Sequence, residues 1–327
     1  MNDRKVAFIT GASAGVGRSV AEMAAEQGMR IGLFARDKER LERVKGYIED
    51  HGGEAMALSG DVVNPGEIEN AASSVENKFG PIDIWINNAM TTVFAPFWKI
   101  TPEEYKRVTE VTYLGFVYGT MAAMKRMRPR NRGTIVQVGS ALAYRSIPLQ
   151  SAYCGAKHAI QGFTESLRSE LIHEKSKIRL TMVQLPALNT PQFDWCEAKQ
   201  DRQPQPVPPI YQPEVAARAI VWAACHDKRE LNVGFRTSLI LWGNKFFPGF
   251  GDRYLASKGY SGQLTKDPIK PDRPSNLWHS VSGNFGAHGR FNDVAIRNSP
   301  FFWFTTHSGL IFISGFLLMI LIFALSR

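Results

Sequence analysis

VAFITGASAGVGRSVAEMAAEQG, residues 6–28, decides the fold of this chain. The first five residues of the stretch form a short apolar run, which is typical of a buried parallel strand. Residues 16–27 carry apolar side chains at helical spacing, so a helix is expected to follow. Between strand and helix stand Gly11, Gly15 and Gly17. Glycines at such a junction let the backbone approach a phosphate, and the helix N-terminus offers that phosphate free N–H groups.

The chain continues with the same alternation of apolar strands and amphipathic helices. Strand-like runs lie at residues 31–34, 55–58, 82–86, 134–138 and 180–185, and helical stretches at residues 38–51, 65–79, 102–127 and 151–173. Strands that alternate with helices form a parallel sheet with helices on both faces. Ligands of such sheets bind beyond the carboxyl ends of the strands, where the glycine turn, Asn87 and Ser140 all fall.

A second pattern places two titratable side chains on one helical face. Tyr153 and Lys157 are one helical turn apart, and Ser140 precedes the tyrosine by thirteen residues. A phenol has an unperturbed pKa of about 10, and a nearby ammonium group lowers that pKa toward the range of a useful acid–base catalyst. A serine hydroxyl from another element is suited to orient a carbonyl oxygen beside the phenol.

Four motifs in this order resemble the short-chain dehydrogenase/reductase family, classical type. They are TGASAGVG at residues 10–17, NNA at residues 87–89, Ser140, and YCGAK at residues 153–157. The resemblance covers roughly residues 4–235 and implies a Rossmann-like, doubly wound parallel sheet of about seven strands. It also implies a nicotinamide cofactor, hydride transfer between a carbonyl and an alcohol, and a homo-oligomer.

The resemblance assigns roles to residues by position. Catalysis falls to Ser140, Tyr153 and Lys157. Thr112 stands where the family often has an asparagine that holds a water, and its hydroxyl has either that relay role or a bond back to the helix backbone. The implied cofactor contacts are Gly11, Ser13, Gly15, Val16, Gly17, Arg36, Asp61, Val62, Asn88, Tyr153, Lys157 and Thr190.

The choice of cofactor depends on the end of the second strand. Family members that select NAD carry an acidic residue there, whereas this chain has Ala35 and Arg36. An arginine can bind a 2′-phosphate through charge-assisted hydrogen bonds, and a carboxylate would repel it. Asp37 follows directly and is expected to cap the next helix. We therefore predict NADP(H) as the preferred cofactor, with NAD(H) as the alternative.

The substrate is expected to be a hydrophobic carbonyl compound or alcohol. The residues that flank the predicted site are mostly large and apolar, which indicates a roomy pocket, although half of them packing the loops is an equal alternative. We assign to this pocket Met90, Phe94, Tyr144, Phe193 and Trp195. Residues 192–212, rich in proline, glutamine and charge, are expected to form a mobile lid.

The C-terminal part predicts a membrane anchor. Residues 308–325 contain no charge, and a helix of about 20 apolar residues crosses a bilayer core. We expect a catalytic domain at residues 1–258, an extended and partly docked linker at 259–303, and one transmembrane helix at 304–326. The alternatives for that helix are a buried position or a subunit contact. Because the N-terminus enters the first strand at once, no secretory signal is expected and the catalytic domain should face the cytosol.

Composition restricts the remaining classes of function. The net charge is +9, and the densest basic run, KRMRPRNR at residues 125–132, lacks any nucleic-acid recognition motif, so nucleic acid is not an expected partner. Three cysteines suit a reducing compartment, and the dispersed histidines predict no metal site. The rival to an active enzyme is a low-turnover NADP(H)-binding sensor or scaffold protein at the membrane. Substrate, reaction direction and subunit number are not fixed by the sequence.

Overall fold

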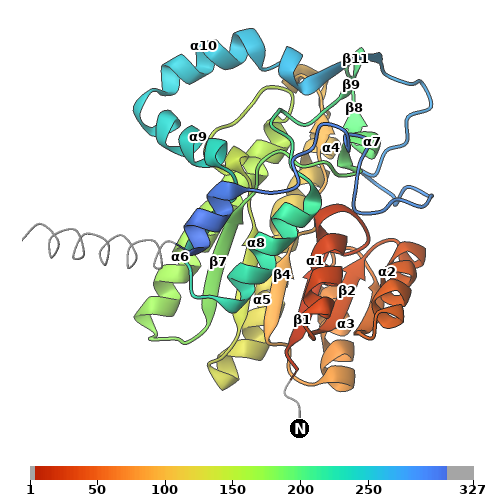
Figure 1. Ribbon diagram of the computed structural model, residues 1–327, viewed down its shortest axis with the longest axis vertical. Coiled ribbons are helices and arrows are strands. Elements are labelled where there is room, and N and C mark those ends of the chain that lie inside the picture. Colours follow the sequence, from red (N-terminus) through yellow and green to blue (C-terminus); the bar gives the residue numbers. More distant parts are fainter. Residues whose placement is uncertain (1–3, 308–327) are drawn as a thin grey trace, which may run out of the picture.

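The computed structural model describes residues 4–307 and is built around a parallel sheet (Figure 1). Seven strands follow the order β10-β7-β6-β4-β1-β2-β3. They are β1 (Val6–Thr10), β2 (Arg30–Ala35), β3 (Glu54–Ser59), β4 (Ile84–Asn87), β6 (Thr134–Val138), β7 (Arg179–Gln184) and β10 (Glu230–Asn232). The chain starts in the middle of the sheet and winds outward to both edges, so the predicted doubly wound α/β fold is confirmed.

Helices cover both faces of this sheet. The α-helices are α1 (Gly15–Glu26), α2 (Lys38–Asp50), α3 (Pro65–Phe79), α4 (Pro102–Thr109), α5 (Gly115–Met127), α6 (Ser151–His173), α7 (Gln192–Trp195), α8 (Pro213–Cys225), α9 (Phe235–Phe246) and α10 (Pro248–Lys258). One apolar layer joins the sheet to α1, α2 and α8, and a second joins it to α3, α5 and α6. Burial on both faces explains why the strands are apolar throughout.

The glycine turn between β1 and α1 is folded back tightly on itself. Gly11 and Gly15 have φ values of 68° and 57°, which side chains with a Cβ rarely adopt. A Cβ on Gly17 would lie 2.1 Å from the carbonyl oxygen of Gly11. The Nδ2 of Asn88, just after β4, donates to that same oxygen at 3.2 Å. Glycine at position 17 thus lets the start of α1 rest directly on the end of β1.

The long helix predicted at residues 102–127 is interrupted. A π-helical turn, Glu110–Leu114, separates α4 from α5 and contains Thr112. The hydroxyl of Thr112 accepts from the backbone N–H of Thr91 at 3.0 Å and donates to its carbonyl at 2.8 Å. The wide turn holds this side chain against the loop that follows β4. Turns of this kind are frequent near functional sites.

Residues 192–212, predicted as a lid, contain regular structure. They include α7 and two short strands, β8 (Glu197–Ala198) and β9 (Arg202–Pro204). β8 pairs with β5 (Val93–Phe94). β9 pairs with β11 (Leu264–Pro268), which belongs to the region predicted as a linker. The segment is therefore held by strand pairing at two places, through β8 to the loop region after β4 and through β9 to the C-terminal region.

The predicted transmembrane anchor is not supported. Among residues 4–307, no helix is long and apolar enough to cross a membrane. The predicted span, 304–326, lies from residue 308 onward outside the described residues. On this finding the prediction of a transmembrane helix, and of a membrane location with a cytosolic catalytic domain, is wrong for the chain as far as it is described.

Substitution of Gly17 tests the tight turn. Gly17→Ala should lower the free energy of unfolding by about 1–3 kcal/mol, because the new methyl group would clash with the Gly11 carbonyl and the backbone must move. Gly162→Ala is the control, since this position in α6 has open space around it and alanine favours a helix. Urea unfolding of the purified protein measures both changes, and equal stability of Gly17→Ala and the unsubstituted protein would contradict the argument.

Candidate active site

Four loops meet at the carboxyl edge of the sheet and carry the predicted site residues. The glycine turn follows β1, Asn88 follows β4, Ser140 follows β6 and Thr190 follows β7. Two cavities open there, of about 180 Å³ and about 1230 Å³. Val16, Asn88 and Thr190 line both cavities, so the two adjoin. The carboxyl edge of the sheet thus carries two adjoining cavities next to the glycine turn, where ligands bind in this fold.

The larger cavity brings together the three residues predicted to be catalytic. Tyr153 and Lys157 project into it from the first turns of α6, and Ser140 reaches it from the loop after β6. Ser140 is held there because its Oγ accepts a hydrogen bond from the backbone of Leu142 at 3.2 Å. The Nζ of Lys157 donates to the carbonyl of Val138 at 2.7 Å and lies 5.5 Å from the centre of the Tyr153 ring.

Burial controls the protonation of this pair. It raises the pKa of Tyr153 above its ordinary value, and the hydrogen bond with the Ser140 hydroxyl opposes this shift. Burial also lowers the pKa of Lys157 to about 7. The expectation that Lys157 depresses the phenol pKa below its ordinary value is therefore not met, because burial of the phenol has the largest effect on that pKa. Tyr153 is a protonated phenol under these conditions and is suited to donate a proton.

Thr112 lies beside this site and is fully buried. Its single O–H donor is engaged by the carbonyl of Thr91, so that hydroxyl has no further proton to donate to a water. The structure gives Thr112 the role of holding the loop after β4, and its relay role stays a prediction.

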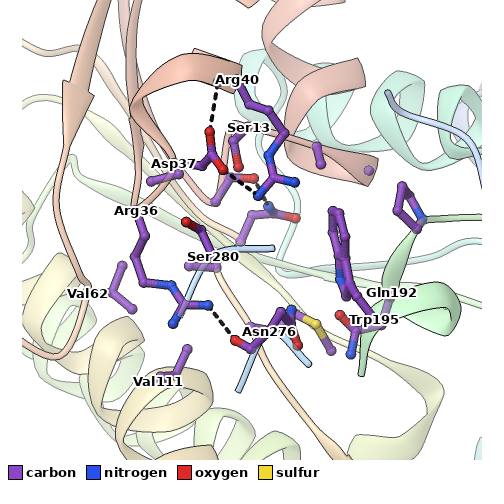
Figure 2. Close-up of a pocket in the computed structure, with 18 of the residues that line it drawn as sticks. Ser13, Arg36, Asp37, Arg40, Val62, Val111, Gln192, Trp195, Asn276 and Ser280 are labelled. Carbon is purple, nitrogen blue, oxygen red and sulfur yellow. Dashed lines mark hydrogen bonds and ion pairs between the residues drawn. The ribbon is translucent and has the colours of Figure 1, made fainter. Parts of the chain in front are cut away.

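The smaller cavity contains most of the predicted cofactor contacts. It is lined by Gly11, Ser13, Gly15, Val16, Arg36, Asp61, Val62, Asn88 and Thr190 (Figure 2). Gly17 does not line it and packs beneath the turn. Asp37 caps α2 as expected, since its Oδ1 accepts from the backbone N–H of Arg40 at 2.8 Å. Arg36 is therefore the charged residue at the end of β2 that lines the cavity without capping the next helix.

Cations outnumber carboxylates around this smaller cavity. Arg36, Arg40 and Arg107 converge there, whereas Asp37 pairs with Arg40 at 3.0 Å and Asp61 pairs with Arg107 at 2.5 Å. Burial lowers the pKa of Arg36 and also that of Arg40, each against the opposing effect of a carboxylate. These guanidinium groups have lost part of their hydration, and a bound anion would restore the missing interactions.

Sequence reasoning missed several residues of the smaller cavity and its surroundings. Arg40 could have been found, because it stands three residues after the helix cap Asp37 and so returns to the same end of α2. Arg107 comes from α4, and Asn276 and Ser280 come from the C-terminal extension. No local pattern in the sequence marks these three positions.

The predicted substrate pocket is partly corrected. Met90, Phe94 and Phe193 line the larger cavity as expected. Tyr144 does not, because its hydroxyl donates to Oε1 of Glu230 at 2.6 Å, and burial together with this carboxylate raises its pKa. Trp195 lines the smaller cavity, where its ring lies 4.9 Å from the Arg40 guanidinium.

Residues of α9, of α10 and of the junction between these helices complete the lining of the larger cavity. They are Leu239, Phe247, Phe250, Tyr254 and Leu255. The volume of about 1230 Å³ exceeds the roughly 300–1,000 Å³ common for small-molecule sites, so the cavity has room for a bulky or long apolar ligand.

Lys157→Met tests the burial of the lysine. A base whose pKa is lower in the folded than in the unfolded protein destabilises the fold at low pH, and this penalty disappears as the pH rises from the folded value, about 7, to the ordinary value, 10.5. Lys157→Met should therefore be more stable than the unsubstituted protein at pH 6, by a margin that shrinks toward pH 10. Thermal unfolding across this range measures the difference, and a margin that grows with pH would contradict the assignment.

Comparison of the sequence with known proteins agrees with this geometry. The sequence model described as short chain dehydrogenase matches residues 5–201. YxnA of Bacillus subtilis (strain 168), described as an uncharacterized oxidoreductase, is 34% identical over 281 residues, which make up 85% of this chain and 79% of the relative.

Solved structures give the same result. A metagenomic short-chain oxidoreductase in complex with NADP has a TM-score of 0.59 and 25% identity, and the match covers 70% of this chain and 96% of that one. A variant of actinorhodin polyketide ketoreductase with NADPH has a TM-score of 0.62 and 25% identity over 71% of this chain and 97% of that one. The protein described here thus belongs to the short-chain dehydrogenase family and is an NAD(P)-dependent oxidoreductase.

Proposed function

We propose that this chain is an NADP(H)-dependent oxidoreductase that interconverts a carbonyl group and an alcohol on a hydrophobic substrate, with Tyr153 as the proton donor and acceptor. One observation carries the proposal. Tyr153, Lys157 and Ser140 lie in one large cavity that adjoins the glycine turn. A proton donor and an oxygen-orienting hydroxyl thus lie within one cavity, beside the part of the fold that binds dinucleotides.

The residues of the smaller cavity fit NADP(H). The N–H groups in the first turn of α1 have no partner within the helix and face the glycine turn, where a pyrophosphate binds in this fold. The surplus of guanidinium groups around Arg36 suits the additional 2′-phosphate. Two relatives of known structure, at 25% identity, are complexes with NADP or NADPH. When bound, the reduced nicotinamide supplies the hydride.

The side chains in the larger cavity supply the remaining chemistry of reduction. The protonated phenol of Tyr153 gives its proton to the carbonyl oxygen as negative charge develops there, and the Ser140 hydroxyl donates a hydrogen bond to the same oxygen. Proton transfer leaves a phenolate next to Lys157. With a pKa of about 7, the lysine can take up a proton at neutral pH, and its ammonium group then stabilises that phenolate.

The walls of the larger cavity favour an apolar substrate. Aromatic side chains approach from three elements: Phe94 from β5, Phe193 from α7, and Phe247 from the junction of α9 and α10. They present apolar surface to whatever occupies the space beyond Tyr153, and a large apolar substrate gains most from burial there. A hydrophobic ketone, aldehyde or alcohol is therefore the substrate class we propose.

Tyr153→Phe tests the catalytic assignment. Loss of the phenolic proton should reduce kcat/KM for NADPH-dependent carbonyl reduction by about 10²–10⁴-fold, with NADPH affinity nearly unchanged. Tyr144→Phe is the matched control, because its hydroxyl bonds Glu230 outside the cavity, and it should keep its activity. A panel of hydrophobic ketones and aldehydes, followed by NADPH absorbance, provides the assay. Full activity of Tyr153→Phe would rule out its role, and NADPH binding without turnover on any substrate would favour the sensor function.

Arg36→Ala tests the choice of cofactor. A hydrogen bond to a charged group contributes about 1.5–3 kcal/mol, so the affinity for NADPH should fall by roughly 10–100-fold while that for NADH changes little. Arg43→Ala is the control, since Arg43 pairs with Glu39 on the exposed side of α2. Titration calorimetry with each dinucleotide measures both affinities. Equal losses for NADPH and NADH would show that Arg36 does not read the 2′-phosphate.

A further inference from the structure

One segment of the C-terminal extension lies directly over the smaller cavity. We call residues 276–292 the strap; it is part of the blue trace in Figure 1. The family sequence model ends at residue 201. The two cofactor-bound relatives are matched over 96% and 97% of their own chains, yet these matches cover only 70% and 71% of this one. The strap therefore lies beyond the part of the chain that the family sequence model matches.

The strap fixes both arginines that line the cavity. Nη2 of Arg36 donates to the carbonyl of Asn276 at 2.5 Å, and Nη1 donates to the carbonyl of Trp278 at 3.0 Å. Figure 2 shows Arg36 pointing toward Asn276 across the cavity. Nη1 of Arg40 donates to the carbonyl of Val281 at 2.9 Å. Arginine has five N–H donors, so these bonds orient each guanidinium and leave donors for a ligand.

A third arginine binds the same segment. Nε of Arg107 donates to the carbonyl of Leu277 at 3.0 Å, while its Nη2 pairs with Asp61. The Leu277 side chain is fully buried against Val93, Ala95 and Val108, which anchors this end of the strap to the body of the protein.

The other end of the strap is attached to the glycine turn and to the loop after β7. The backbone N–H of Gly15 donates to the carbonyl of Gly286 at 3.1 Å, and the N–H of Gly289 donates to the carbonyl of Asn189 at 3.2 Å. Between the two ends, Phe285 packs edge-on against Trp195 with ring centres 4.5 Å apart. The strap thus spans the cavity from the arginines to the phosphate-binding turn.

The chemistry of the strap suits an anionic ligand beneath it. It contains no aspartate and no glutamate, so it brings no negative charge toward the arginines. The side chains of Asn276 and Ser280 line the cavity and offer polar groups. The cavity under the strap measures about 180 Å³, below the roughly 300–1,000 Å³ of small-molecule sites. The adenosine half of a dinucleotide therefore fits only when the strap moves away from the cavity.

We propose that the strap is the outer wall of the adenosine half of the cofactor site, that it positions Arg36 and Arg40 for the 2′-phosphate, and that its opening limits cofactor exchange. This inference rests on the proposed use of NADP(H). It assigns to the C-terminal extension a share in cofactor selectivity, because the guanidinium groups that distinguish NADPH from NADH are held by strap carbonyls. It also makes the release of NADP(H) slower than an open cleft would allow.

Leu277→Ala tests the strap, because it loosens the anchor without touching any cavity residue. Binding is followed in the full-length protein by energy transfer from tryptophan to the reduced nicotinamide, and dissociation by stopped-flow displacement. NADPH should dissociate at least about tenfold faster than from the unsubstituted protein, and the ratio of NADPH to NADH affinity should fall by a similar factor. Phe285→Ala removes the contact with Trp195 and lies outside the hydrophobic core clusters, and it should change both quantities in the same direction.

Two controls separate the strap from general destabilisation. Leu231→Ala truncates an equally buried leucine in β10, at the sheet edge opposite β2 and β3, and should leave both quantities unchanged. Gly46→Ala adds a methyl group to α2 at a position where nothing lies within 4 Å and which lines neither cavity, so it too should behave as the unsubstituted protein.

The outcomes distinguish the two proposals. If the unsubstituted protein binds NADPH but Leu277→Ala and Phe285→Ala keep its dissociation rate and its selectivity, the strap is not part of the site. Tighter NADPH binding by these variants would show that the strap competes with the cofactor, which also overturns the inference. Failure of the unsubstituted protein to bind NADPH would instead overturn the proposed cofactor, and the role of the strap with it.

Discussion

The site depends on the close contact between the start of α1 and the end of β1. No side chain fits between Gly17 and the Gly11 carbonyl, and Asn88 closes the contact from β4 by donating to the same oxygen. These contacts join the neighbouring strands β1 and β4 at their carboxyl ends. They thereby fix where the helix N-terminus points and set the boundary between the two cavities. The two cavities keep their mutual position because Val16 of this turn and the neighbouring Asn88 line both.

Burial gives the site its chemical character. The interior disfavours every charge placed in it, and this one effect raises the pKa of Tyr153, lowers that of Lys157, and strips water from Arg36. The Tyr153 phenol therefore stays protonated, and the pKa of Lys157 lies near neutral pH. Because Arg36 has lost hydration, binding an anion stabilises it more than the same anion would stabilise a fully hydrated arginine. The same desolvation destabilises the empty site and strengthens its binding of a charged ligand.

The C-terminal extension shows how a common fold acquires its own binding properties. In several of its hydrogen bonds to the rest of the protein, strap carbonyls accept from arginine side chains and from the backbone N–H of Gly15. Such bonds need only a suitable path of the main chain and place little demand on the strap sequence. α9 and α10 use a different means, since they close the larger cavity with apolar side chains. The two halves of the site are thus enclosed by polar backbone on one side and by aromatic surface on the other.

Local pattern alone determined the order of strands and helices, the glycine turn, the cap at Asp37, and the convergence of Ser140, Tyr153 and Lys157. These features depend on short-range periodicity and on the rule that parallel strands end at one edge. Only the tertiary structure decided where Tyr144 and Trp195 point, that Arg107 meets Leu277, and how burial sets the pKa values of Tyr153 and Lys157. The apolar C-terminal run was wrongly given a transmembrane role on composition alone, and no helix of residues 4–307 supports it. The physical reason is the separation along the chain: the hydrogen bond between Arg36 and Asn276 joins positions 240 apart in sequence, and no local propensity encodes such a contact.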